Sequence, residues 1–270
     1  METIIAAVLV ISGLGFLLGY GLAFAAKKLE TPRDERTAAV EQCLPGVNCG
    51  ACGYAGCSGY AQAIVTQGVP LHLCAPGGAE AANAIGRIMG IAVHVGAQKK
   101  ARIHCGGGSD VTRQKFRYNG VADCRSAAAL FDGFLQCSAG CLGLGSCVNV
   151  CRFDAISIDA NGHTTIREDR CTGCGACVPA CPRKLIELVE ADRRVHVLCN
   201  STEKGAVCNK ICQVGCIGCM KCEKTCRYDA IHVINNLAII DYAKCTSCGE
   251  CVPVCPKKCI IDLGKTPGAS

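Results

Sequence analysis

The chain begins with a long apolar run. Residues 3–26 contain no charged side chain, and Lys27 and Lys28 follow directly. A helix over this run would extend about 36 Å, which is enough to cross a hydrocarbon core of about 30 Å. A cleaved signal peptide fits less well, because the run is too long and no positive charge precedes it. The pattern predicts a transmembrane anchor over residues 1–28, with the rest of the chain on the side of the basic residues, the cytoplasm.

Beyond residue 28, apolar and polar positions alternate only over short stretches. These are residues 156–158 and 164–166 around Asn161-Gly162, and residues 231–233 and 237–240 around Asn235-Asn236. Short alternating runs that flank Asn-rich turns are typical of β-hairpins. An Ala-rich segment, residues 79–90, is predicted to be helical. Together these patterns indicate an α+β fold.

The cysteine content adds a second feature to this fold, because 27 of the 270 residues are cysteine. Their number is odd and most lie two or three residues apart, a separation at which neighbours rarely form a disulfide. A reducing cytoplasm also disfavours disulfides. Aromatic residues make up only 4% of the chain. Metal centres can organise domains that lack large side chains, since metal-binding free energy becomes folding free energy.

One cysteine motif occurs three times in the C-terminal half. The copies of Cys-x2-Cys-x2-Cys-x3-Cys are Cys171, Cys174, Cys177 and Cys181; Cys216, Cys219, Cys222 and Cys226; and Cys245, Cys248, Cys251 and Cys255. In bacterial ferredoxins three thiolates of this motif hold one [4Fe–4S] cluster, and the fourth reaches the other cluster of a pair. Zinc sites use two Cys-x2-Cys pairs separated by a longer loop. The motif therefore predicts iron–sulfur clusters.

The same half contains an internal repeat of about 75 residues. At an offset of 75, Cys124, Cys137, Cys141, Cys147 and Cys151 align with Cys199, Cys212, Cys216, Cys222 and Cys226. The repeat predicts two tandem bacterial-type 2[4Fe–4S] ferredoxin-like units, residues 137–195 and 196–270, after a connector over residues 101–136.

Crossed pairing of the motifs assigns two clusters to each unit. The first unit would use Cys151, Cys171, Cys174 and Cys177 for one cluster, and Cys137, Cys141, Cys147 and Cys181 for the other. The second unit would use Cys226, Cys245, Cys248 and Cys251, and then Cys216, Cys219, Cys222 and Cys255. Leu144 stands where the repeat would place a cysteine, and Cys137 is the expected substitute.

A separate group of cysteines precedes the repeats, in residues 29–100. Cys49, Cys52, Cys57 and Cys74 could hold zinc or one cluster. The neighbouring ferredoxin-like units favour a small 4Fe–4S domain, which brings the expected number of clusters to five. For Cys105, Cys124, Cys199 and Cys212 two interpretations stay open, single thiols or a sixth cluster. Cys43, Cys208 and Cys259 are expected to be lone thiols.

The formal net charge of +6 does not indicate a nucleic-acid-binding protein. Five clusters with their thiolates would bring it to about −4. No run of basic residues interleaved with aromatics supports nucleic-acid binding either. A smaller set of basic residues near the motifs could form a face for an acidic ferredoxin or simply be solvated: Arg183, Lys184, Lys221, Lys224, Lys257 and Lys258.

Three stretches together resemble a known family. They are "LPGVNCGACGYAGC", "CAPGG" and "GCLGLGSCVNVCRFDAI", placed between an apolar anchor and tandem ferredoxin motifs. This order resembles the B subunit of the Rnf complex over nearly the whole chain. The resemblance implies a translocase that couples electron flow between ferredoxin and NAD to Na⁺ or H⁺ movement. It also implies a single-pass protein of the inner cell membrane with its clusters on the cytoplasmic side.

In that family the B subunit accepts electrons from soluble ferredoxin and relays them to flavin-bearing and integral membrane subunits. The chain would then be part of an oxidoreductase without a complete active site of its own. Two other functions compete with this interpretation, a membrane-tethered redox sensor and a polyferredoxin of another complex. A sensor needs only one or two clusters, and a simple polyferredoxin needs neither the anchor nor the group from Cys49 to Cys74.

Overall fold

The computed structural model describes the backbone of residues 2–28 and 34–264, and the side chains of these residues except 2, 3, 6, 7, 10 and 26–28. The helices are α1 (Glu2–Lys28), α2 (Glu35–Gln42), α3 (Gly56–Gln67), α4 (Gly78–Met89), α5 (Cys124–Ala129), α6 (Ser146–Asn149), α7 (Cys177–Ala180), α8 (Gly205–Ile211) and α9 (Lys221–Thr225). The strands are β1 (Lys99–Ile103), β2 (Ile156–Ile158), β3 (Thr164–Ile166), β4 (Ile186–Glu190), β5 (Val195–Val197), β6 (Ile231–Ile234), β7 (Leu237–Ile240) and β8 (Ile260–Asp262).

The predicted anchor region is helical. α1 carries apolar side chains with large exposed fractions, among them Leu9, Phe16 and Leu22. Within the residues that the structure describes, however, no helix is both long and apolar enough to cross a bilayer. The predicted transmembrane anchor over residues 1–28 is therefore not supported. Residue 1 and several side chains of α1 lie outside the described part of the chain.

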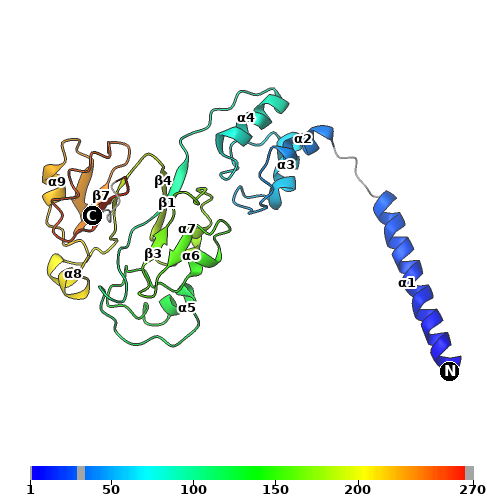
Figure 1. Ribbon diagram of the computed structural model, residues 1–270, viewed down its shortest axis with the longest axis horizontal. Coiled ribbons are helices and arrows are strands. Elements are labelled where there is room, and N and C mark those ends of the chain that lie inside the picture. Colours follow the sequence, from blue (N-terminus) through cyan, green and yellow to red (C-terminus); the bar gives the residue numbers. More distant parts are fainter. Residues whose placement is uncertain (1, 29–33, 265–270) are drawn as a thin grey trace.

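The first globular part is a three-helix domain formed by α2, α3 and α4 (Figure 1). Tyr60 lies at its centre and packs with the fully buried Val40 and Ile85. The hydroxyl of Tyr60 donates to the carbonyl of Pro70 at 2.7 Å and accepts the N–H of Leu73 at 3.1 Å. These bonds fix the loop that leads to Cys74 against α3. The helix predicted over residues 79–90 is confirmed as α4.

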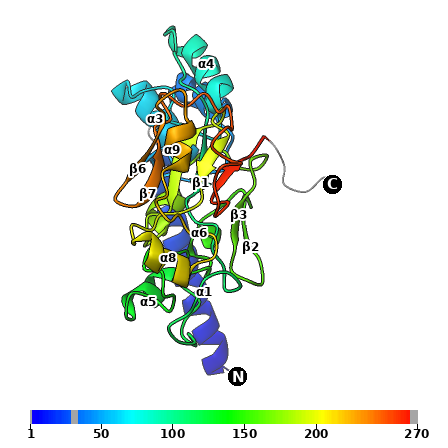
Figure 2. The same cartoon turned by 90° about the vertical axis from the view of Figure 1, so that its left-hand side faces the viewer.

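Two further parts share one topology, in which an outer strand pair encloses a hairpin. In the first unit β1 pairs antiparallel with β4 and β2 pairs with β3; in the second, β5 pairs with β8 and β6 with β7. Figure 2 shows the two hairpins as separate ribbons. Both predicted hairpins are confirmed. At the second turn Asn235 and Asn236 have φ angles of +48° and +67°, which suit a tight two-residue connection.

The backbone repeats at the level of single residues. Asp154 and Asp229 have φ angles of +48° and +50°, and Lys184 and Lys258 have φ angles of +51° and +50°. Non-glycine residues adopt such angles rarely, so their recurrence at equivalent positions is strong evidence for a true structural repeat. The predicted repeat is confirmed.

The first unit reaches further toward the N-terminus than its cysteine motifs suggest. Ile103 of β1 lies opposite Ile186, just as Val197 of β5 lies opposite Ile260. By this register the structural counterpart of Cys199 is Cys105. The alignment of Cys199 with Cys124 at a constant offset was therefore wrong, because the chain inserts a long loop between β1 and α5.

Candidate metal centres

All the cysteines lie in the described part of the chain and are free thiols. Cys219 and Cys248 are exposed, and the others are buried or half-buried. The structure thus offers a large set of reduced sulfur atoms, most of them shielded from water. Their usefulness as ligands depends on whether they converge.

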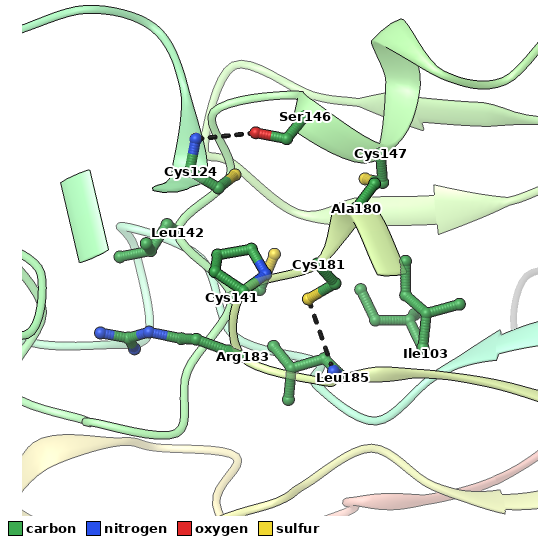
Figure 3. Close-up of a pocket in the computed structure, with 12 residues that line it drawn as sticks. Ile103, Cys124, Cys141, Leu142, Ser146, Cys147, Ala180, Cys181, Arg183 and Leu185 are labelled. Carbon is green, nitrogen blue, oxygen red and sulfur yellow. Dashed lines mark hydrogen bonds between the residues drawn. The ribbon is translucent and has the colours of Figure 1, made fainter. Parts of the chain in front are cut away.

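One site of convergence is a cavity in the first unit. Four cysteines direct their sulfur atoms toward it, and Figure 3 shows them around one shared space: Cys124, Cys141, Cys147 and Cys181. Most of the remaining lining is apolar, including Ile103, Leu142 and Ile186. Such a lining excludes water and surrounds the sulfur atoms on several sides.

Hydrogen bonds at the start of α5 explain how Cys124 reaches this cavity. The carboxylate of Asp123 caps the helix by accepting the N–H of Ser126 at 2.8 Å. Ser146, the first residue of α6, donates its hydroxyl to Asp123 at 2.8 Å and accepts the N–H of Cys124 at 2.8 Å. The two helices are tied together, so Cys124 comes to lie beside Cys147.

The lining of this cavity differs from the predicted ligand set. Cys137 was expected to substitute for the cysteine missing at position 144, but it does not line the cavity. Cys124, which was grouped with Cys105, Cys199 and Cys212, lines it instead. Sequence spacing held no signal for it, because the approach depends on the cap and on Ser146, both remote from the motif.

The other predicted set of the first unit gathers around the core near β1. Cys171 and Cys177 are buried there, with Cys151 packed against the same cluster. The sulfur of Cys171 accepts the N–H of Ala101 at 3.4 Å. Burial, followed by the nearby thiols of Cys174 and Cys171, raises the pKa of Cys177 to about 12.

The second unit has two cavities of the same kind. One is lined by Cys216, Cys219, Cys222 and Cys255, together with Cys259. The other is lined by Cys226, Cys245, Cys248 and Cys251. Each cavity combines three cysteines of one motif with the last cysteine of the other. Crossed pairing of this kind requires both motifs to fold together.

The N-terminal group is organised by Asn48. Its side-chain oxygen accepts the N–H of Cys57 at 2.7 Å. Gly56 has a φ angle of +86°, and a Cβ there would lie 2.7 Å from the same oxygen. Burial raises the pKa of Cys74, and the thiols of Cys57, Cys49 and Cys52 add to this effect. Only glycine fits the turn that brings these thiols together.

The chemistry of these sites fits a [4Fe–4S] cluster. Burial raises the pKa of Cys147 and Cys222 to about 11, so iron binding must displace protons from these thiols. Backbone N–H groups point at sulfur, as Leu185 does to Cys181 and Ala230 to Cys226, both at 3.4 Å. Such donors stabilise the anionic sulfur of a bound cluster.

A site for a single ion is a different arrangement, which needs three or more ligands around one point. In residues 34–264 and the described part of α1, no three His, Cys, Asp or Glu side chains are arranged to hold one metal ion. The three cysteines expected to be lone thiols have different surroundings. Cys43 donates to the carbonyl of Ala39 at 3.4 Å, and the sulfur of Cys259 lies 3.5 Å from that of Cys255. Cys208 is fully buried beside Cys199.

Family models match the same segments of the chain. Residues 44–76 match a family described as "Putative Fe-S cluster". Residues 137–188 and 215–259 match "4Fe-4S dicluster domain" families, and residues 199–229 match a "4Fe-4S binding domain" family. These matches confirm that the cysteine motifs belong to 4Fe–4S domains.

Whole-chain relatives agree with the domain matches. The B subunit of the ion-translocating oxidoreductase complex of Methanosarcina acetivorans is 42% identical over 96% of this chain and 98% of its own length. The B subunit of the Na(+)-translocating ferredoxin:NAD(+) oxidoreductase complex of Acetobacterium woodii is 40% identical over 98% of this chain and 81% of its own. The B subunit of the proton-translocating ferredoxin:NAD(+) oxidoreductase complex of Clostridium ljungdahlii is 40% identical over 95% of this chain and 91% of its own. The resemblance to the Rnf B subunit is confirmed, and the chain belongs to the family of B subunits of ion-translocating oxidoreductase complexes.

Proposed function

We propose that this chain accepts electrons from reduced ferredoxin and relays them through [4Fe–4S] clusters to other subunits of a membrane complex. That complex would be an ion-translocating ferredoxin:NAD oxidoreductase, as the names of two relatives describe. The observation that carries the proposal is the convergence of four thiols, drawn from two motifs, on each apolar cavity of the second unit.

Clusters held in this way exchange one electron at a time. A relay of single electrons needs closely spaced centres, which the shared motifs of each unit supply. Hydride chemistry at NAD and the movement of ions are assigned to partner subunits. Relatives of equal identity are named for Na⁺ and for protons, so the proposal names neither ion.

We propose five ligand sets, which the placement of the thiols supports. They are Cys49, Cys52, Cys57 and Cys74; Cys124, Cys141, Cys147 and Cys181; Cys151, Cys171, Cys174 and Cys177; Cys216, Cys219, Cys222 and Cys255; and Cys226, Cys245, Cys248 and Cys251. The last four sets lie on loops and short helices between the strands of the two units, and the first lies in the three-helix domain. Bound iron would add to the stability of these small cores.

The proposed docking face for ferredoxin is narrower than the sequence suggests. Arg183 is nearly buried, with a side-chain exposure of 6%, and donates to the carbonyls of Cys137 and Gly140. It therefore does not belong to that face. Lys184, Lys221, Lys224 and Lys258 are exposed and can attract an acidic partner.

Membrane attachment is proposed from the sequence. The uncharged run over residues 3–26 has the length of a single-pass anchor and no charged residue that could form an ion path. Washing membranes with alkaline carbonate tests this, and release of the protein into the wash would contradict it.

The proposed function is tested with anaerobically purified protein. Iron and acid-labile sulfide are measured first, followed by electron paramagnetic resonance after addition of reduced ferredoxin. We expect iron and sulfide in equal amounts, and signals of reduced clusters within the mixing time. Zinc in place of iron, or clusters that stay oxidised beside reduced ferredoxin, would contradict the proposal.

A further inference from the structure

The two ferredoxin-like units each contain an equivalent cluster loop, and the two loops differ in charge. Residues 171–177 read "CTGCGAC", and residues 245–251 read "CTSCGEC". Ala176 thus stands where the second unit has Glu250. The centres proposed on these loops are called the first loop centre, with Cys151, Cys171, Cys174 and Cys177, and the second loop centre, with Cys226, Cys245, Cys248 and Cys251. Because their ligand patterns match, differences between them come from their surroundings.

A second difference lies on the strand that packs against each loop. Eleven residues after the last cysteine of each of these sequences stand Leu188 on β4 and Asp262 on β8. A Cβ at Gly175 would lie 3.3 Å from Cδ1 of Leu188. A Cβ at Gly249 would lie 3.2 Å from Oδ2 of Asp262. In the second unit a carboxylate therefore takes the place that an apolar side chain fills in the first.

The carboxylate of Asp262 is buried and incompletely hydrogen-bonded. The residue is 5% exposed and lies opposite Val195, which lines the cavity of the second loop centre. Oδ1 accepts the N–H of Gly264 at 2.9 Å, whereas Oδ2 has no hydrogen-bond partner in the described part of the chain. Such a group lowers stability, and its charge acts strongly on its surroundings because little water screens it.

Glu250 adds a second negative charge at the same site. Its side chain lines the cavity of the second loop centre. Its carboxylate lies 3.3 Å from Nε of Arg227, whose side chain is 79% exposed. An ion pair with so exposed a partner is weak, so it does not cancel the charge of Glu250 at the cavity. Ala176 supplies no such charge in the first unit.

The basic residues at the two loops do not reverse this difference. In the first unit the ammonium of Lys100 donates to the carbonyl of the first cysteine of the loop. In the second unit the guanidinium of Arg193 donates to the equivalent carbonyl. Arg193 also pairs with Glu190 at 3.3 Å and with Asp192 at 3.5 Å. Its positive charge is therefore partly compensated by these two carboxylates.

Two further groups near Asp262 do not neutralise it. Arg194 donates to the carbonyl of Ser247 at 3.1 Å, but the residue is exposed, so water screens its charge. His196 is close enough to Asp262 to interact with it electrostatically. Burial and the guanidinium of Arg102 lower the pKa of His196 to about 4, so the imidazole is uncharged at neutral pH.

We propose that Asp262 and Glu250 set the reduction potential of the second loop centre below that of the first loop centre. Reduction adds one negative charge to a cluster, and nearby carboxylates make this addition less favourable. One electron then moves spontaneously from the second loop centre, which is oxidised, to the first, which is reduced. No bond or proton changes place. The use of this step for electrons from ferredoxin rests on the proposed function, whereas the difference in potential requires only that the clusters are present.

The test uses the full-length protein with anaerobically reconstituted clusters. Dithionite reduces it stepwise at controlled potential, and electron paramagnetic resonance follows each centre. Cys174→Ser and Cys248→Ser each alter the signal of one loop centre and thereby identify it. We expect the second loop centre of the unmodified protein to be reduced at the more negative potential. Equal potentials, or the opposite order, would overturn the proposal.

Variants of similar size test the side chains themselves. Asp262→Asn and Glu250→Gln each remove one charge and should shift the midpoint of the second loop centre to a more positive potential, while the first loop centre keeps its value. Ala176→Glu should shift the first loop centre to a more negative potential, and Ala176→Gln should not. Glu203→Gln, at an exposed position of the second unit, is the matched control for loss of a charge.

Unchanged midpoints in both Asp262→Asn and Glu250→Gln would overturn the proposal, and so would an equal shift in Glu203→Gln. If Asp262→Asn loses its clusters, the shifts in Glu250→Gln and Ala176→Glu provide the test. Dithionite replaces ferredoxin as the reductant in these measurements. A chain that shows this order of potentials but takes no electrons from ferredoxin would contradict the proposed function and leave this inference intact.

Discussion

The Nε of Arg102 lies 3.0 Å from Nε2 of His196, and this contact joins β1 of the first unit to β5 of the second. His196 is fully buried, and its other ring nitrogen lies 2.8 Å from the hydroxyl of Tyr242. Arg102 is also buried and pairs with Glu168 at 3.0 Å. A polar network of this kind fixes the orientation of the two units and thereby the spacing of their clusters.

The buried imidazole should make the junction sensitive to acid. Burial and the guanidinium of Arg102 lower the pKa of His196 from 6.5 to about 4. Below pH 6.5 the imidazole binds a proton in the unfolded chain, whereas in the folded chain it stays neutral down to about pH 4. The stability that is present above pH 6.5 is therefore lost as the pH falls from 6.5 toward 4. We expect the melting temperature of His196→Gln to fall less steeply over this interval than that of the unmodified protein.

The control for this prediction is His72→Gln, at an exposed position. It should keep the pH dependence of the unmodified protein. Thermal melts followed by circular dichroism at several pH values make the comparison. Parallel curves of melting temperature against pH for His196→Gln and the unmodified protein would show that the imidazole does not contribute to the pH dependence of stability.

Substitution of Cys124 distinguishes the proposed ligand set from the one that spacing predicts. Cys124→Ser should lose about four iron atoms per chain, because it removes one ligand of the cavity around Cys141, Cys147 and Cys181. Iron analysis and the visible absorbance of the clusters give the result. Cys43→Ser is the matched control, and full iron content in Cys124→Ser would contradict the assignment.

Gly56 offers a test of the N-terminal centre. Gly56→Ala combines a φ angle of +86° with a close approach of the new methyl to Asn48, so it should cost more than the about 1–2 kcal/mol of left-handed strain alone. Gly53→Ala is the control, since its φ angle is +88° and no heavy atom lies within 4 Å of its Cβ. We expect Gly56→Ala to lose iron more readily to a chelator, and equal rates in the two variants would count against this interpretation of the turn.

Arg183 should be more important for stability than its counterpart in the second unit, Lys257. Removing its guanidinium in Arg183→Met leaves the carbonyls of Cys137 and Gly140 without their donor, at a cost of about 3 kcal/mol. Lys257 donates to the side chain of Asn209 at the surface, so Lys257→Met should change stability by less than about 1 kcal/mol. Denaturant unfolding under anaerobic conditions compares the two, and similar losses would contradict the structural role of Arg183.

Local sequence patterns predicted much of the fold. Contacts between distant segments account for the places where the structure differs from those predictions. The hairpins followed from alternation around Asn161-Gly162 and Asn235-Asn236, because turn chemistry and strand pattern act over a few residues. The position of Cys124 beside Cys141, Cys147 and Cys181 could not be read from spacing. It depends on the pairing of β1 with β4 and on Ser146, and the constant offset concealed the insertion after β1.

The central claim is that these thiols hold clusters that receive electrons from ferredoxin. The most direct measurement is an anaerobic titration of the purified chain with reduced ferredoxin, in which the electrons accepted per chain are counted from the absorbance changes of both proteins. The account predicts the uptake of about one electron per cluster, about five per chain, with bleaching of the cluster absorbance. A chain that contains iron but accepts no electrons from ferredoxin would contradict it.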